Sequence, residues 1–199
     1  MAKHLPFRLI LASGSLGRRE LLQQAGYNFE VMPSRVAEPT GQGVTDPRRF
    51  VHEVAWLKAA AVAPQVAEGV VLAADSVAWA ANQIIGKPDD EADARRILRL
   101  LGAAPHQLWT GVVLWRRPDD LQLCWQEATE VAFQQLSDAE LDAYLATRLW
   151  QGCSGAYALQ GENDPFVRVV RGSPSNVVGL PMESLERGLG LMASRHHGS

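Results

Sequence analysis

Residues 7–32 read FRLILASGSLGRRELLQQAGYNFEVM, and this stretch decides the class of fold. The apolar run 7–12 predicts a buried strand, and three small residues follow it at positions 13–15. Residues 16–25 then predict a helix that ends before Gly26, and residues 27–32 predict a second strand. A strand, a tight turn, a helix and a strand in succession indicate an α/β fold.

The rest of the chain continues this alternation. Asp46 before Pro47 predicts the start of a helix that runs to about residue 66, with one face formed by Phe50, Val54, Leu57 and Ala61. Residues 70–77 predict an apolar strand, and residues 79–85 its return in a hairpin. We further expect a helix over 90–101, long strands over 108–115 and 121–133, and a helix that begins with a capping box at Ser137. Together these elements predict one α/β domain with two lobes over residues 1–199.

Composition narrows the functional class. Of the 199 residues, 47% are hydrophobic and 21% are charged, and the formal net charge is −3. This balance argues against a protein that coats polymeric nucleic acid. Cys124 and Cys153 form no C-x-x-C pair, which favours a reduced, cytoplasmic protein. We see neither a signal peptide nor a membrane span.

The turn at Ser13, Gly14 and Ser15 is the first candidate site. Small residues that lead from a strand into a helix present backbone N–H groups at the positive end of the helix dipole, which suits a phosphate. Arg18 and Arg19 lie in the first turns of that helix, and one of them could point back and bind phosphate oxygens with two N–H groups. The alternative is an ordinary turn followed by solvated arginines.

Asp75 is the second candidate, because an unpaired carboxylate is costly to bury in an apolar strand. At the end of that strand it could hold a divalent cation or accept a proton from water. The alternative is a structural aspartate that caps a turn. Lys58 and Lys87 could each neutralise phosphate charge, although each on its own is better explained as a solvated surface lysine.

Two stretches rich in small residues are further candidates. Residues 155–161, GAYALQG, place Gln160 in a loop where its amide could hydrogen-bond to the edge of a base. Residues 172–181, GSPSNVVGLP, could line the same cleft. The alternatives are a tight structural loop and a plain connection between a strand and a helix.

Taken together, seven stretches in this order resemble the Maf family of nucleotide pyrophosphatases, from residue 9 to about residue 186. They are LASGS…RRELL near the start, KA at 58–59, ADS at 74–76, GKP at 86–88, H106…TGV at 110–112, GAYALQG at 155–161 and NVVGLP at 176–181. The resemblance implies a mixed central sheet flanked by helices, two lobes around a cleft, and similarity to inosine triphosphate pyrophosphatases. It also implies hydrolysis of nucleoside triphosphates to a monophosphate and pyrophosphate with Mg²⁺ or Mn²⁺, and frequently a homodimer.

The resemblance also assigns roles by position. Asp75 matches the family's proposed proton acceptor, and Glu38 matches an acidic position that helps to bind the metal. The matches to the phosphate site are Ser13, Arg18, Lys58 and Lys87. Positions associated with the choice of base are Gly17, Ser76 and Gln160.

The chain departs from the family at the positions that choose the base. Gly17 stands where the thymidine and uridine triphosphate group has Arg and the 7-methylguanosine triphosphate group has Trp, and Ser76 stands where those groups have Thr or Gln. Gln160 agrees with the first group. The resemblance therefore extends to the reaction more firmly than to the substrate, and Gly17 suggests a roomier base pocket.

Two other functions stay open from the sequence. The same residues could bind a nucleotide without hydrolysing it, as a regulator of cell division. Alternatively, the protein could be a phosphohydrolase that releases orthophosphate. The identity of the products distinguishes these functions.

Overall fold

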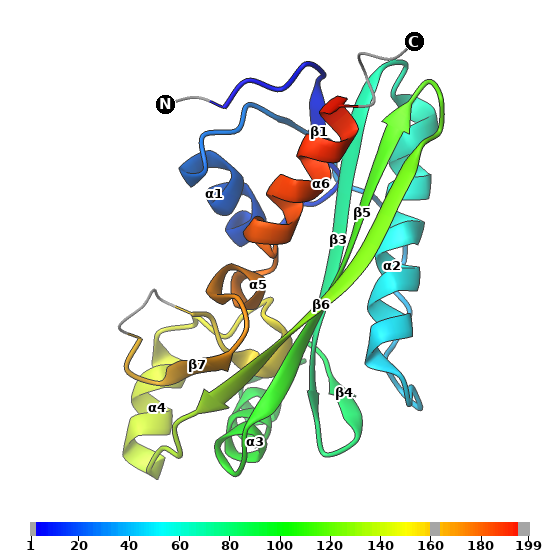
Figure 1. Cartoon of the computed structure of the whole chain (residues 1–199). Coiled ribbons are helices and arrows are strands. Elements are labelled where there is room, and N and C mark those ends of the chain that lie inside the picture. Colours follow the sequence, from blue (N-terminus) through cyan, green and yellow to red (C-terminus); the bar gives the residue numbers. More distant parts are fainter. Residues whose placement is uncertain (1–2, 160–163, 195–199) are drawn as a thin grey trace.

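Three strands of twelve residues each form the centre of the fold (Figure 1). The computed structural model describes residues 3–159 and 164–194. In chain order its elements are β1 (Leu9–Leu11), α1 (Leu16–Gln24), β2 (Glu30–Val31), α2 (Pro47–Val62), β3 (Gly69–Ala80), β4 (Gln83–Ile85), α3 (Glu91–Gly102), β5 (His106–Arg117), β6 (Gln122–Phe133), α4 (Asp138–Ala146), β7 (Val167–Arg171), α5 (Pro174–Val178) and α6 (Met182–Ser194). Short 3₁₀ helices cover Ala63–Gln65 and Ser154–Ala156.

The strands form a mixed sheet, as predicted, and it contains seven strands in the described ranges. Their order is β2-β1-β3-β5-β6-β7, and β4 pairs with β3 off this path. The pairs β2–β1 and β1–β3 are parallel, whereas β3, β5, β6 and β7 pair antiparallel. The pairing between β1 and β3 stops at Leu11 and Leu72, while β3 continues beside β5. This early end of β1 leaves the second half of β3 next to the turn that leads into α1.

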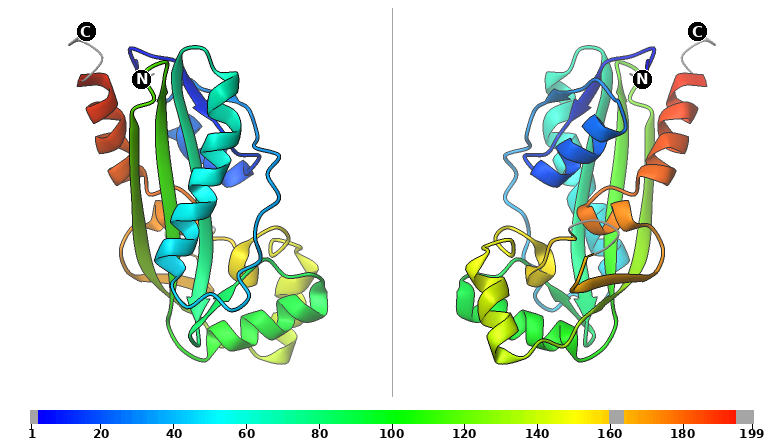
Figure 2. Two further views of the ribbon diagram at one scale, coloured as in Figure 1. Left: turned by 90° about the vertical axis from the view of Figure 1, so that its right-hand side faces the viewer. Right: turned by 90° about the vertical axis from the view of Figure 1, so that its left-hand side faces the viewer.

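Helices cover both faces of the upper sheet (Figures 1 and 2). On one face, Ala55, Ala59 and Val62 of α2 pack on Val71 and Ala73 of β3. On the other face, side chains of α1 and α6 pack on the strands, among them Leu22, Leu185, Leu189 and Met192. Because side chains alternate along a strand, odd-numbered residues of β3 face α2 and even-numbered residues face α1 and α6.

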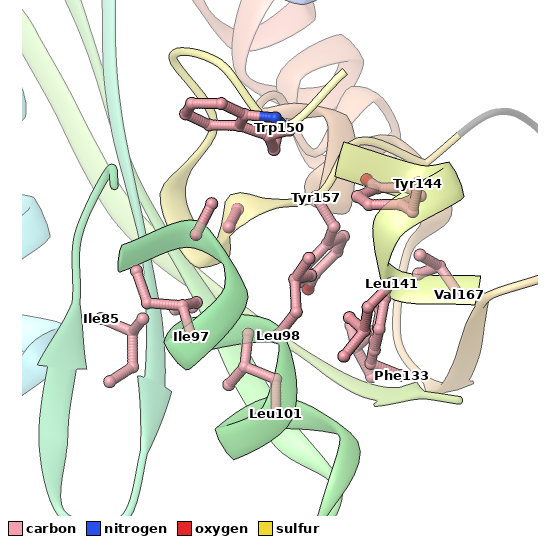
Figure 3. Close-up of a cluster of buried hydrophobic side chains, with 14 of the residues drawn as sticks. Ile85, Ile97, Leu98, Leu101, Phe133, Leu141, Tyr144, Trp150, Tyr157 and Val167 are labelled. Carbon is pink, nitrogen blue, oxygen red and sulfur yellow. The ribbon is translucent and has the colours of Figure 1, made fainter. Parts of the chain in front are cut away.

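A separate hydrophobic cluster forms the second lobe at the other end of the long strands (Figure 3). Helices α3 and α4 pack there with β4 and the 150–157 segment. The cluster includes Ile85, Ile97, Leu98, Leu101, Phe133, Leu141, Tyr144, Trp150, Tyr157 and Val167. The predicted two lobes are therefore present, and β3, β5 and β6 run through both.

Local sequence signals explain the main boundaries. The Asp46 side chain accepts hydrogen bonds from the backbone N–H groups of Arg48 and Arg49, which caps α2 as predicted. The capping box at Ser137 is also present. Between β3 and β4, Ala81 and Asn82 adopt φ values of 48° and 57°, as a tight two-residue hairpin turn requires.

Several details differ from the sequence-based expectations. The first two strands are shorter than predicted, and the stretch 172–181 contains the helix α5. The buried side of α2 is formed by Val51, Val54, Ala55, Lys58, Ala59 and Val62, whereas Leu57 is 40% exposed. Small alanines allow α2 to lie close to the sheet. Because this close packing needs the alanine side of the helix, it also buries Lys58, which lies on the same side. Within the described ranges, no helix is long and apolar enough to cross a membrane.

Candidate active site

The turn between β1 and α1 is held by its own serines. The Ser13 hydroxyl accepts a hydrogen bond from the backbone N–H of Ser15 over 3.2 Å, and Ser15 caps α1. Ser13 is buried, while Gly14 is exposed, and a Cβ added to Gly14 would meet no atom within 4 Å. The turn thus combines fixed serine side chains with an open backbone at the start of a helix.

Arg18 is buried and binds three parts of the chain. Its Nε donates to the Gly179 carbonyl over 2.9 Å, and its two terminal nitrogens donate to the hydroxyls of Ser13 over 3.1 Å and Ser76 over 3.2 Å. Burial lowers the pKa of Arg18, while the charges of Asp75 and Glu38 oppose that shift. The guanidinium is therefore fixed in place and lies within the electrostatic reach of both carboxylates.

Ser76 connects Arg18 to the second lobe. Its hydroxyl lies 2.9 Å from that of Thr110, which is fully buried in β5, and its carbonyl accepts a hydrogen bond from Ser154 over 3.1 Å. Thr110, Ser154 and the Gly179 carbonyl were not among the site residues predicted from the sequence. The only signal for them there was their position inside or next to the quoted motifs.

The carboxylates and lysines form a cluster on the other face of β3. Lys58 Nζ lies 2.6 Å from Asp75 Oδ1 and 2.8 Å from Glu38 Oε1. Lys87 Nζ lies 3.9 Å from the second oxygen of Glu38. The side chains of Lys58 and Asp75 are 8% and 9% exposed, whereas those of Glu38 and Lys87 are 46% and 57% exposed. The cluster therefore has a buried pair inside and a solvent-accessible pair outside.

Partial burial by itself raises the pKa of Glu38. The hydrogen bond and charge of Lys58, together with the charges of Lys87 and Arg18, outweigh burial and hold that pKa below its usual value. Glu38 is consequently a carboxylate at neutral pH, available to a cation.

Gly111 brings α2 to the strands at this point. It pairs with Asp75 across β3 and β5, and a Cβ at position 111 would lie 2.3 Å from the Val51 carbonyl oxygen. The α2 backbone can approach β5 so closely only over a glycine. Lys58, two turns further along α2, is thereby placed against Asp75.

Within the described ranges, most of the predicted site residues fall into two networks. Ser13, Arg18 and Ser76 share one network, and Glu38, Lys58, Asp75 and Lys87 share the other. Asp75 lies in the middle of β3, three residues beyond the last residue paired with β1, and not at the end of its strand. Lys58 is buried and not a solvated surface lysine. Gln160 lies outside the described residues.

Val178 of α5 lies next to Gly17, in the direction that a side chain at this position would take. A Cβ at this position would lie 3.0 Å from Val178 Cγ1 and 3.2 Å from the Val178 carbonyl oxygen. Helix α5 therefore lies close to Gly17. The roomier base pocket expected at this position stays a prediction.

Oxygen ligands are what Mg²⁺ and Mn²⁺ prefer. Asp75 and Glu38 direct one oxygen each toward a single point, at which Lys58 Nζ lies. In the part of the chain that the structure describes, no group of three or more His, Cys, Asp or Glu could hold a metal. Two carboxylates fit an ion of the Mg²⁺ type, which completes its coordination with water and substrate phosphates.

Fold and contacts thus define an α/β protein in which a turn at the start of a helix lies beside a cluster of charged side chains. The sequence model of the Maf-like protein family matches residues 8–191, and the chain belongs to this family. It is 39% identical over 182 residues to proteins of Bacillus cereus and Bacillus thuringiensis subsp. konkukian, each named dTTP/UTP pyrophosphatase. A Bacillus anthracis protein of the same name is 38% identical. Each match covers 92% of this chain and 94% of the relative.

Proposed function

We propose that this protein hydrolyses nucleoside triphosphates to a nucleoside monophosphate and pyrophosphate. The observation that carries the proposal is the gathering of Arg18, Lys58 and Lys87 around the carboxylates of Asp75 and Glu38. A triphosphate carries about four negative charges at neutral pH, so fixed positive charge favours its binding and the spread of charge in the transition state. The names of the relatives support the same reaction.

In this mechanism the turn Ser13–Ser15 and Arg18 hold phosphate oxygens at the start of α1. Lys58 and Lys87 neutralise the phosphate chain from the opposite side. Asp75 orients a water molecule and accepts its proton as the water oxygen bonds to phosphorus. The anhydride bond between the α and β phosphates breaks, and pyrophosphate leaves.

Asp75 and Glu38 are the residues that would hold Mg²⁺ or Mn²⁺. Such an ion, when bound, neutralises phosphate charge and acidifies a bound water molecule. Glu38 suits this role because half of its side chain is open to solvent and to an arriving nucleotide, whereas Asp75 is buried. We place the enzyme in the cytoplasm, where its substrates are.

The base is the less defined part of the proposal. We propose dTTP and UTP as the first substrates to test, because the relatives are named dTTP/UTP pyrophosphatase. The absence of a side chain at Gly17 and the small Ser76 argue for a panel that also contains 7-methylguanosine triphosphate and ordinary purine triphosphates. A preference for a modified nucleotide would support removal of non-canonical nucleotides as the purpose.

The test incubates purified protein with this panel and Mn²⁺ or Mg²⁺ and measures pyrophosphate and orthophosphate separately. We expect one pyrophosphate and one nucleoside monophosphate for each triphosphate that is hydrolysed. The Asp75→Asn protein, purified in parallel, controls for contaminating phosphatases. Orthophosphate as the first product would indicate a different phosphohydrolase, and tight binding without turnover would indicate a nucleotide-binding regulator.

A further inference from the structure

Lys58 occupies the point at which the two acidic side chains of the site converge. Its Nζ donates to Asp75 over 2.6 Å and contacts Glu38 over 2.8 Å, and its side chain is only 8% exposed. No other lysine has this position, since the chain contains only Lys3, Lys58 and Lys87. Lys87 reaches only the outer oxygen of Glu38, at 3.9 Å, and is 57% exposed.

Two facing carboxylates need a cation between them. Desolvated like charges repel strongly, so a buried Asp75 beside Glu38 would be unfavourable without a counter-charge. The lysine ammonium is a compact point charge and meets this need in the absence of any ligand. A divalent cation bound by the same two oxygens would lie against that ammonium, so both cannot hold this position together.

We propose that Lys58 is the built-in counter-cation of the substrate-free site and competes directly with the divalent metal for Asp75 and Glu38. The inference rests on the proposed function for the identity of the metal. Lys58 leaves the carboxylates readily when triphosphate oxygens offer its ammonium a new partner, and without nucleotide it leaves them only at high metal concentration. Metal alone therefore binds weakly, and metal together with nucleotide binds tightly.

This role differs from that of a residue that only binds phosphate. A lysine that only binds phosphate lies away from the metal ligands, so in the absence of nucleotide its charge weakens metal binding only slightly, by repulsion at a distance. A competing lysine weakens metal binding strongly in the absence of nucleotide. The two roles therefore predict different effects when the charge of Lys58 is removed.

The test measures the Kd of Mn²⁺ without nucleotide, from the electron paramagnetic resonance signal of free Mn²⁺. Lys58→Met keeps the length of the side chain and removes its charge, and we expect a Kd at least about tenfold lower than in the wild type. Lys3→Met, which changes an exposed lysine paired with Glu186, should leave the Kd unchanged. Lys87→Met should lower the Kd less than Lys58→Met. Adding Asp75→Asn to Lys58→Met should abolish the gain, which locates the bound ion.

An unchanged or higher Kd in Lys58→Met would overturn the proposal. A second measurement needs no substitution of Lys58. Wild-type protein labelled with ¹³C-lysine gives three lysine Cε signals, of which Lys3→Arg and Lys87→Arg identify two, and the third is Lys58. Saturating Mg²⁺ should shift the Lys58 signal and leave the Lys3 signal in place; a Lys58 signal that stays in place would refute the competition.

These outcomes are separate from those of the proposed function. Pyrophosphate release by the wild type tests the reaction, whereas the Kd and the Lys58 signal are measured without substrate. The enzyme could hydrolyse triphosphates while Lys58 leaves metal affinity unchanged. In that case the proposed function stands and the competition does not.

Discussion

Lys58 of α2 donates a hydrogen bond to Asp75 of β3 over 2.6 Å, and both side chains are almost fully buried. This contact joins the helix on one face of the sheet to the strand that runs through both lobes. The buried ammonium gives the Asp75 carboxylate a partner of opposite charge in a region where a lone carboxylate would be unfavourable. The pair therefore fixes a charged group at the centre of an otherwise apolar strand.

Asp75→Asn should abolish most of the activity with the fold retained. Asparagine keeps the shape of the side chain, but it neither accepts a proton nor provides a full negative charge. We expect kcat to fall at least about a hundredfold in a pyrophosphate-release assay, with an unchanged circular dichroism spectrum. Asp142→Asn, in an exposed ion pair with Arg95, is the control and should keep wild-type turnover. Comparable turnover in both variants would remove Asp75 from the mechanism.

Arg18→Lys should weaken both stability and substrate binding. Lysine cannot donate at once to the Gly179 carbonyl and to the hydroxyls of Ser13 and Ser76, so buried acceptors lose their partner. We expect the free energy of unfolding to fall by about 1–3 kcal/mol and KM to rise. Urea denaturation and steady-state kinetics measure the two effects. Arg19 is more exposed and, within the described residues, donates to the nearby carbonyls of Ser15 and Gly14, so Arg19→Lys should change both much less.

Gly111→Ala should push α2 away from β5. The new methyl group would lie 2.3 Å from the Val51 carbonyl oxygen, a backbone atom that cannot yield without moving the helix. We expect a loss of about 3 kcal/mol in urea denaturation and a lower kcat, because Lys58 moves with α2. Gly190→Ala, in α6 with no atom within 4 Å of the new Cβ, should instead stabilise by up to about 1 kcal/mol. Equal effects at the two positions would contradict the close approach of α2.

Stability should depend on pH through His106. Burial lowers the pKa of His106 from 6.5 to about 4, and its Nε2 lies 2.8 Å from the Tyr157 hydroxyl. The unfolded chain binds a proton near pH 6.5 and the folded protein only near pH 4, so the free energy of unfolding rises with pH between these values. The contribution is on the order of 3 kcal/mol, complete above about pH 6.5 and lost as the pH falls toward 4.

Urea denaturation at several pH values between 4 and 7 measures this dependence. His106→Gln should flatten the curve in this range. The matched histidine substitution is His52→Gln, at a half-buried residue of α2 that contacts Gln126. An unchanged slope in His106→Gln would assign the pH dependence to other groups.

Local signals in the sequence determined much of the fold. The turn after β1, the cap at Asp46, the capping box at Ser137 and the hairpin at Ala81–Asn82 are each set by a few neighbouring residues. The order of the motifs identified the family. Such features are predictable because helix caps, tight turns and strand periodicity depend on short-range sterics and hydrogen bonds.

Only the tertiary structure decided how Lys58 and Arg18 are used. The composition of α2 allowed more than one apolar face, and the close contact over Gly111 selected the face that buries Lys58 against Asp75. Likewise, the partners of Arg18 come from positions 13, 76 and 179, which only the packing of β1, β3 and α5 brings together. The sequence by itself determined which charged residues the site contains; their pairing depends on contacts between distant segments, which no local pattern encodes.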